Sequence, residues 1–300
     1  MSSPLKSAIA LTALIALAAC STGLTPIPAR SPAGSFTPPH FKHIFMVILE
    51  NEDAGKALDQ PFLKRLASEG AYLSNFYAIA HPSQPNYMAL LSGTTDGIHG
   101  DATVTVDRRH LGDLLEARGL RWKSYAEDYP GGCNLDAHID HYVRRHEPFL
   151  NFRNVQSDPA RCANVVNARD LQSDVASGSL PDFALFIPNN LHNGHDRGIA
   201  SADAFMAATF GPLLQDPRFT RDLLFIVTFD EAEGRSDQNR IYTVLWGDTV
   251  RSGTVSDVVY THYDLLRTVE ESLGLGTLGA HDADPDTRPI SGVWRNGSSE

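Results

Sequence analysis

The chain has 300 residues, of which 36 are Asp or Glu and 25 are Lys or Arg, so its formal net charge is −11 with neutral His. Hydrophobic residues make up 42% and charged residues 20%, a composition that excludes an intrinsically disordered chain. The acidic balance argues against nucleic acid as a partner, because phosphate backbones are bound by basic surfaces. A phosphorylated small molecule is compatible with an acidic chain as a ligand, because a bound metal ion can supply the positive charge that the phosphate needs.

Residues 1–19 have the pattern of an export signal. Lys6 precedes a run of 12 residues, AIALTALIALAA, that is apolar except for Thr12. A helix needs about 20 apolar residues to span a bilayer, so this run is too short for that and suits a signal peptide. The run leads into Cys20 through Leu-Ala-Ala, which resembles the bacterial lipobox. We expect lipidation of Cys20 and attachment to the bacterial envelope, at the outer membrane in a Gram-negative host; simple secretion is the alternative.

Residues 20–40 are expected to be a tether before a single domain at 41–300. The segment is rich in Ser, Thr, Pro and Gly and lacks apolar periodicity. Beyond it the chain contains Cys133 and Cys162 as its remaining cysteines. In an exported protein we expect these two to form a disulfide bond, and two free buried thiols are the alternative.

Apolar runs alternate with helical patterns between residues 41 and 275. We expect strands at 41–49, 72–77, 122–126, 182–187, 223–229 and 241–246. We expect helices at 61–69, 86–91, 111–118, 200–214 and 261–273. The alternation predicts an α/β fold with a largely parallel central sheet flanked by helices. The stretch 127–181 is irregular and rich in His, so we expect it to be an insertion over one end of the sheet.

Acidic and amide side chains follow two of the most apolar runs. Glu50 and Asn51 come directly after 41–49, and Asp230 and Glu231 come directly after 223–229. In open α/β sheets, ligands gather at the carboxyl ends of the strands. Oxygen ligands suit Ca²⁺, Mg²⁺ or Mn²⁺, and nearby His leaves Zn²⁺ open. The sequence therefore predicts a metal site, with a solvated turn as the alternative for each pair.

Ser83 lies between Pro82 and Pro85, just before the helix expected at 86–91. The start of that helix would point free N–H groups toward Ser83 and favour a bound anion. Ser83 could then act as a nucleophile toward a phosphate or a carbonyl, or it could merely cap the helix. Its Pro and Gln neighbours differ from the Gly-x-Ser-x-Gly turn of acyl hydrolases, which makes a Ser-His-Asp acyl hydrolase a weak interpretation.

Three histidines also lie near predicted strand ends. They are His192 and His195, the latter beside Asp196, and His262, which opens the last helix. A lone His is more often a structural hydrogen-bonding residue than a catalyst, but three in such loops favour a role in proton transfer.

Six segments in order resemble a known family. They are Glu50-Asn51, HPSQPNYMALLSG (81–93), YVRRHEPFLNF (142–152), NNLHNGHD (189–196), TFDEAEG (228–234) and THYDLLRTVEESLGL (261–275). Their order and spacing are similar to those of the bacterial phosphoesterase family, which joins secreted acid phosphatases with non-specific phospholipases C inside the alkaline-phosphatase superfamily. Within that family the chain is most similar to the compact secreted acid phosphatases.

The resemblance implies roles for individual residues. It makes Ser83 the nucleophile, and it makes His195 and His262 contacts of the phosphate or proton donors. Relatives often carry acidic residues where this chain has Leu191 and Asn193, so we expect one divalent metal ion rather than two. The implied metal ligands are Glu50, Asn51, Asp230 and Glu231, and the implied substrate-binding residues are Asn86, His81, His146 and His192.

The expected activity is that of a metal-dependent phosphomonoesterase of the acid-phosphatase type, acting through a phosphoserine intermediate. Its substrate is expected to be a phosphomonoester, with lipid and inositol phosphates among the candidates. The nearest alternative is a phosphodiesterase of the phospholipase C type, followed by a hydrolase of other phosphate or sulfate esters. An alternative from another class is a non-catalytic envelope lipoprotein, which would be expected to have lost some of the metal ligands or Ser83.

Overall fold

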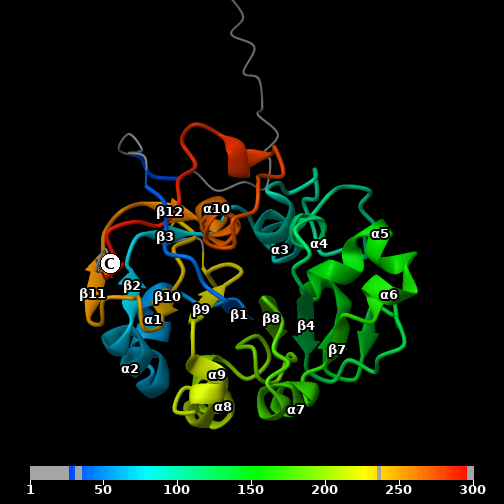
Figure 1. Ribbon diagram of the computed structural model, residues 1–300, viewed down its shortest axis with the longest axis horizontal. Helices are drawn as coiled ribbons and strands as arrows, with labels where there is room; N and C mark the ends of the chain where they lie inside the picture. Colours follow the sequence, from blue (N-terminus) through cyan, green and yellow to red (C-terminus); the bar gives the residue numbers. More distant parts are fainter. Residues whose placement is uncertain (1–26, 31–35, 235–237, 296–300) are drawn as a thin grey trace, which may run out of the picture.

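The computed structural model describes residues 27–30, 36–234 and 238–295, so Cys20 and the expected signal segment lie outside the described residues. Eight strands form one sheet in the order β11-β2-β10-β9-β1-β8-β4-β7 (Figure 1). β10 runs antiparallel to both of its neighbours, and the other strand pairs are parallel. The strands are β1 (His43–Leu49), β2 (Ala71–Leu73), β4 (Trp122–Ala126), β7 (Val165–Asn167), β8 (Phe183–Ile187), β9 (Leu223–Phe229), β10 (Thr243–Trp246) and β11 (Thr254–Ser256).

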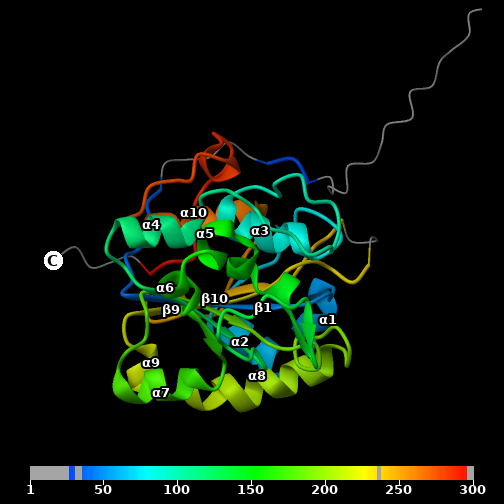
Figure 2. The same cartoon turned by 90° about the vertical axis from the view of Figure 1, so that its right-hand side faces the viewer.

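Helices cover both faces of this sheet (Figure 2). One face carries α3 (Gln84–Ser92), α4 (Leu111–Ala117) and α10 (His262–Ser272), and the other carries α2 (Pro61–Glu69), α7 (Asp170–Ser177), α8 (Ile199–Leu213) and α9 (Pro217–Thr220). The remaining elements are α1 (Ala54–Leu58), α5 (Arg153–Gln156), α6 (Pro159–Cys162), the 3₁₀ turns η1 (Arg144–His146), η2 (Pro148–Asn151) and η3 (His281–Ala283), and the strand pairs β3 (Phe76–Tyr77) with β12 (Tyr260–Thr261) and β5 (His138–Ile139) with β6 (Tyr142–Val143). The expected α/β fold with a largely parallel sheet is confirmed.

The central strands β1 and β9 are fixed by burial on both faces. All seven residues of β9 are buried, and in β1 only His43 is partly exposed. The ring of Phe45 in β1 lies 5.2 Å from that of Phe219 and 5.8 Å from that of Phe210, which packs α9 and α8 against the strand. Continuous apolar runs of this kind are typical of parallel strands covered by helices. The ends of β1 and β9 are therefore rigid positions for side chains.

The insertion expected at 127–181 is only partly present. Residues 127–164 contain only short elements and are joined by the disulfide bond between Cys133 and Cys162, whose Cα atoms are 5.5 Å apart, as expected. Residues 165–181 instead supply β7, which pairs in parallel with β4, and α7. A strand of three residues carries too little periodicity for sequence analysis to separate it from a loop.

Part of the expected tether lies against the domain. Arg30 forms an ion pair with Asp264, a buried residue of the first turn of α10. The N–H of Phe41 donates to the carbonyl of Ser272 at 3.3 Å, near the other end of the same helix. A cavity of about 680 Å³ beside this segment is lined by residues that include Phe36, His40 and Arg267, and by none of the expected site residues. Among the described helices, none is long and apolar enough to cross a bilayer.

Candidate active site

The register of the central sheet brings two acidic residues together. Leu49 of β1 pairs with Phe229 of β9, and the N–H of Asp230 donates to the carbonyl of Leu49 at 3.0 Å. Glu50 and Asp230 follow these paired residues, so they lie side by side at the carboxyl edge, and both are fully buried. The N–H of Asn51 donates to Asp230 Oδ1 at 3.1 Å, from a left-handed backbone conformation (φ 50°) that Asn tolerates better than most residues.

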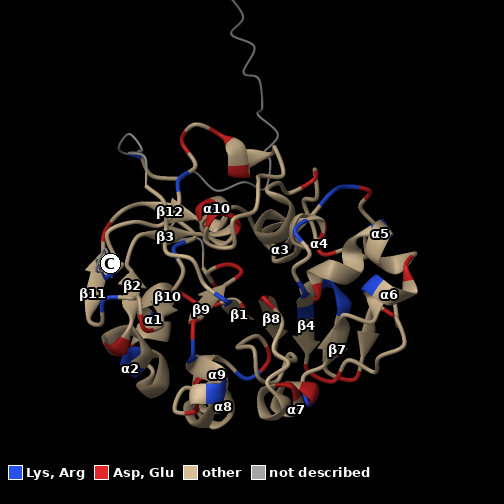
Figure 3. Ribbon diagram, viewed as in Figure 1, with Lys and Arg blue, Asp and Glu red and all other residues tan. Residues whose placement is uncertain are grey.

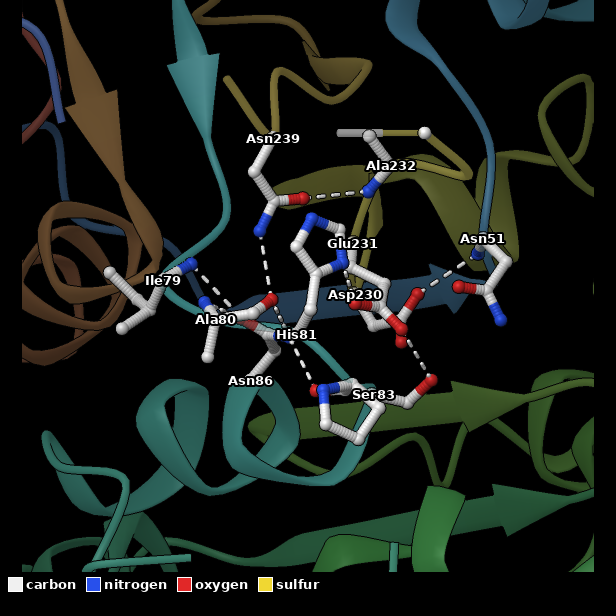
Figure 4. A network of polar contacts seen from close by, with 12 residues as sticks. Asn51, Ile79, Ala80, His81, Ser83, Asn86, Asp230, Glu231, Ala232 and Asn239 are labelled. Atoms are coloured by element: carbon white, nitrogen blue, oxygen red, sulfur yellow. Dashed lines mark hydrogen bonds and ion pairs between the residues drawn. The ribbon is translucent and has the colours of Figure 1, made fainter. Parts of the chain in front are cut away.

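Ser83 lies against these acids, in the loop between β3 and α3. Its Oγ is 3.0 Å from Glu231 Oε1 (Figure 4) and 3.1 Å from Glu50 Oε2, and it can donate to either carboxylate. The side chain is 2% exposed. The structure therefore places a hydroxyl group between carboxylates that follow two different strands, as the sequence-based hypothesis of a shared site requires.

The start of α3 differs from both sequence-based expectations. The N–H of Gln84 donates to Asp101 Oδ1 at 3.0 Å, Pro85 has no N–H, and the N–H of Asn86 donates to the carbonyl of Ser83 at 3.0 Å. The first three residues of the helix therefore offer no free N–H to an anion. The Ser83 hydroxyl does not cap the helix either, because it faces the carboxylates.

Asn86 holds the loop that carries Ser83. Its Oδ1 accepts hydrogen bonds from the N–H groups of Ile79 and Ala80, each at 2.9 Å, and its Nδ2 donates to the carbonyl of Ala80 at 2.9 Å and to that of Pro82 at 3.3 Å. The amide is thus fully used by the backbone. The expected contact between Asn86 and phosphoryl oxygens is not supported, and the residue positions the loop instead.

Asn239 links the two loops of the site and was missed by sequence analysis. Its Oδ1 accepts from the N–H of Ala232 at 2.9 Å, and its Nδ2 donates to the carbonyl of Ala80 at 2.8 Å (Figure 4). The residue is fully buried with φ 64°. Asn tolerates this left-handed conformation better than most residues, and that was the one signal in the sequence. The contact with Ala80 could not be predicted, because Ala80 lies 159 residues away.

Two histidines contact the carboxylates directly. His81 Nδ1 contacts Glu231 Oε2, and the buried Nε2 of His81 has no partner in the described part of the chain. His146 stacks on Tyr87, with the two ring centroids 5.4 Å apart, and its Nε2 lies 3.2 Å from Glu50 Oε1 without hydrogen-bond geometry. Burial holds the pKa of His146 well below its usual value, so this ring is neutral.

His262 contacts the backbone of the site and not its carboxylates. Its Nε2 lies 2.8 Å from the backbone carbonyl of Asp230 and must carry the proton to donate there. Burial lowers the pKa of His262 to about 4, so the ring stays neutral. The side chain is fully buried. The expected phosphate contact of His262 is therefore not supported, and the residue positions Asp230.

The loop after β8 packs against Glu50 and carries His195, which is exposed. The N–H of Glu50 donates to the carbonyl of Asn193 at 2.8 Å, and a Cβ at Gly194 (φ 113°) would lie 2.7 Å from the carbonyl of Glu50. His195 Nδ1 lies 2.7 Å from Asp196 Oδ1. His192 contacts Glu127 rather than the carboxylates of the site, with its Nδ1 2.8 Å from Glu127 Oε1.

The electrostatics of the site favour a bound cation. Burial, together with the charge of Glu231, raises the pKa of the Glu50 carboxyl to about 8, although a hydrogen bond from Tyr87 opposes this. Burial and the charges of Glu50 and Glu231 also raise the pKa of Asp230 well above its usual value. Asp230 Oδ2 is buried and has no hydrogen-bond partner in the described part of the chain. Clustered oxygen ligands and an unpaired buried oxygen fit a divalent cation.

A second acidic cluster lies outside the set of expected metal ligands. Carboxylate oxygens of Glu52, Asp53 and Glu233 lie within 4.8 Å of one another. The ammonium group of Lys56 lies 3.2 Å from Glu52 and 3.6 Å from Asp53 and also contacts Glu233. The lysine balances part of the negative charge of this cluster and already occupies its carboxylates, so we assign no metal ion to it.

A family model described as the phosphoesterase family matches residues 55–276, which include Ser83, Asp230 and Glu231. The chain belongs to the phosphoesterase family. An acid phosphatase of Aspergillus fumigatus is 33% identical over 278 residues, which cover 89% of this chain and 62% of the fungal protein. The phosphatidylinositol-3-phosphatase of Mycobacterium tuberculosis is 31% identical over 293 residues, which cover 96% of this chain and 94% of the mycobacterial protein.

The fold is shared with a solved structure. A protein of the alkaline phosphatase superfamily from Vibrio parahaemolyticus superimposes with a TM-score of 0.58 over 89% of this chain and 73% of that one. Their sequence identity is 15%, so this similarity shows the fold alone.

Proposed function

We propose that this member of the phosphoesterase family hydrolyses phosphoric esters and that Ser83 is its nucleophile. The observation that carries the proposal is the position of Ser83 Oγ, about 3 Å from two carboxylates at the carboxyl edge of the sheet. Relatives named as phosphatases that align with most of the chain support the same reaction class.

The residues that would hold one divalent ion are Glu50, Asn51, Asp230 and Glu231. When bound, such an ion supplies positive charge for the phosphate and lowers the pKa of a nearby hydroxyl. The donor set is all oxygen, which favours Ca²⁺, Mg²⁺ or Mn²⁺, while His81 keeps Zn²⁺ as a candidate. The buried, unpaired Oδ2 of Asp230 supports this assignment.

In the proposed reaction, Ser83 Oγ gives its proton to a carboxylate that accepts its hydrogen bond and forms a bond to phosphorus. The bond between phosphorus and the leaving oxygen breaks, and His195, the most exposed histidine of the site loops, donates a proton to that oxygen. Water then attacks phosphorus in the phosphoserine, and His195 takes up a proton from this water. The bond between phosphorus and Ser83 Oγ breaks, phosphate leaves, and Oγ takes back its proton from the carboxylate. Buried neutral His262 holds the backbone of Asp230 in place throughout.

The substrate proposed is a phosphomonoester, with a phosphodiester of the phospholipase C type as the second candidate. Assays of the purified protein with p-nitrophenyl phosphate, bis(p-nitrophenyl) phosphate, phosphatidylcholine and p-nitrophenyl sulfate, each with and without added divalent ions, separate the candidates. We expect the monoester to give the highest kcat/KM. Faster release from either diester would favour the phospholipase type, and no turnover of any ester with any ion would contradict the proposed function.

We further propose that the exported protein is attached to the envelope membrane through lipid on Cys20. The pattern of residues 1–20 supports this, because a short apolar run leads directly to a cysteine in a lipobox-like sequence. Expression in a bacterial host with radiolabelled palmitate should label the protein and leave it in the membrane fraction. The Cys20→Ser variant should be unlabelled and released; equal labelling of both would contradict the proposal.

A further inference from the structure

A bound phosphate raises a charge problem in this site. The proposed substrate brings negative charge to a pocket that already contains Glu50, Asp230 and Glu231. The first residues of α3, which were expected to supply N–H donors, have none free. A side-chain cation that faces the site would add to the charge of a bound metal ion, because phosphate binding relies on positive charge and N–H donors.

The 3₁₀ turn η1 contains two adjacent arginines with different surroundings. Arg144 is a structural residue, because its Nη1 donates to the carbonyl of Leu135 at 2.8 Å and its Nη2 to that of Val104 at 2.7 Å. Arg145 has one ionic contact in the described part of the chain, with its Nε 3.7 Å from Asp101 Oδ2. That Nε is buried and donates no hydrogen bond to any described residue. The guanidinium group of Arg145 therefore has N–H donors that can bind another partner.

Asp101 connects Arg145 to the proposed nucleophile. While Asp101 Oδ2 faces Arg145, its Oδ1 accepts the N–H of Gln84, the residue directly after Ser83. The next residue in η1 is His146, which reaches Glu50. Arg145 is therefore linked to the site in two ways, to Gln84 through Asp101 and to Glu50 through the adjacent His146.

The other basic residues in this part of the molecule are paired with acids. Lys123, Arg153 and Arg161 lie on β4, α5 and α6, to the right in Figure 3. Lys123 pairs with Asp174, Arg153 with Asp107, and Arg161 with Asp113 and Glu116. Their charges are therefore balanced by neighbouring carboxylates.

We propose that Arg145, oriented by Asp101, binds the free oxygens of the substrate phosphate and makes the site selective for esters with a terminal, dianionic phosphate group. The proposal rests on the proposed function and adds a specificity residue to it. A planar guanidinium group can bind two oxygens of one phosphate at once. A monoester offers three such oxygens and up to two charges, whereas a diester offers two oxygens and one charge, so the monoester gains more from Arg145.

Arg145→Ala, Arg145→Lys and Arg153→Ala form the test set. Arg153 is the matched control, because its Nε lies 3.4 Å from Asp107 Oδ2 in an exposed ion pair, so its removal changes the net charge by the same amount. Isothermal titration with inorganic phosphate in the presence of the activating ion measures binding without turnover. KM and kcat for p-nitrophenyl phosphate and bis(p-nitrophenyl) phosphate measure selectivity, and thermal melting checks that each variant folds.

Arg145→Ala should weaken phosphate binding by about ten- to a hundredfold, the range expected for a hydrogen bond between charged groups. Its loss in kcat/KM should be larger for the monoester than for the diester. Arg145→Lys should recover part of the binding, and Arg153→Ala should behave as the unmodified protein. Unchanged phosphate affinity in folded Arg145→Ala, an equal loss for both esters or an equal loss in Arg153→Ala would overturn the inference. If the unmodified protein hydrolyses no ester, the proposed function fails, while the phosphate titration still decides the role of Arg145.

Discussion

Replacement of Ser83 by alanine should lower kcat for a phosphomonoester by about a thousandfold or more, as removal of a nucleophile does in other enzymes. The substitution removes one atom, the Oγ that lies between Glu50 and Glu231. The backbone of the loop should stay in place, because Asn86 holds it through four hydrogen bonds that do not involve Ser83 Oγ. Steady-state rates and acid quenching with ³²P-labelled substrate measure the effect, and the label should appear on the unmodified protein only.

Ser92→Ala is the matched control for this prediction. Ser92 is a fully buried serine at the other end of the same helix, and its hydroxyl donates to the carbonyl of Met88 at 2.9 Å. We expect a small loss of stability, about 1 kcal/mol for one hydrogen bond, and near-normal turnover. Substantial activity in Ser83→Ala, with labelled phosphate on another residue, would show that Ser83 is not the nucleophile.

Removal of divalent ions by a strong chelator should abolish turnover and should also destabilise the folded protein in a pH-dependent way. In the chelated protein, burial raises the pKa of Glu50 from 4.5 to about 8. The folded state then holds a proton that the unfolded state releases, so the contribution of Glu50 to the free energy of unfolding is fully present below about pH 4.5 and is lost as the pH rises to about 8. A bound ion replaces this proton. The difference in Tm between ion-loaded and chelated protein should therefore be small at about pH 5 and larger at about pH 8.

Glu50→Gln provides the control for this pH dependence. In the chelated state the amide has no proton to lose at these pH values, so the decline in Tm between about pH 5 and pH 8 should become shallower. Differential scanning calorimetry of both proteins, with and without ions, measures the four curves. Full activity after stringent chelation, or a difference in Tm that shrinks toward alkaline pH, would contradict a metal bound at Glu50.

Sequence analysis predicted the elements that are buried on both faces. The strands at 122–126 and 223–229 have the expected bounds. For 223–229 the reason is a nearly continuous apolar run bounded by polar residues, which marks a strand covered on both faces. The three-residue strands β7 and β11 were missed, since so few residues show no periodicity. β10 was expected as a strand, but its antiparallel direction depends on tertiary pairing with β9 and β2.

The site residues that directly follow a strand were predictable, because the end of the strand determines where each of them lies. Glu50 and Asp230 follow directly from the ends of β1 and β9, and Ser83 could be chosen from the residues around it. The side-chain partners were not predictable in this way. Asp101 accepts the N–H of Gln84 that was expected to face an anion, and it lies 17 residues from Gln84. The carbonyl of Asp230, which His262 binds, lies 32 residues from His262. Such contacts exist only after folding, so the roles expected for Asn86 and His262 changed.

The pairing of Leu49 with Phe229 has a further consequence for how such a protein can diversify. The spacing between the Glu50 and Asp230 backbones is set by ladder hydrogen bonds of the two innermost strands, and not by any surface loop. Segments outside this strand pair that do not contact Glu50 or Asp230 can therefore lengthen, shorten or exchange side chains without disturbing the ion-binding frame. Asn193 and Gly194 are excluded from this freedom, because both pack against the backbone of Glu50. New ester preferences should arise by remodelling this periphery, while substitutions inside β1 or β9 should cost stability and chemistry together.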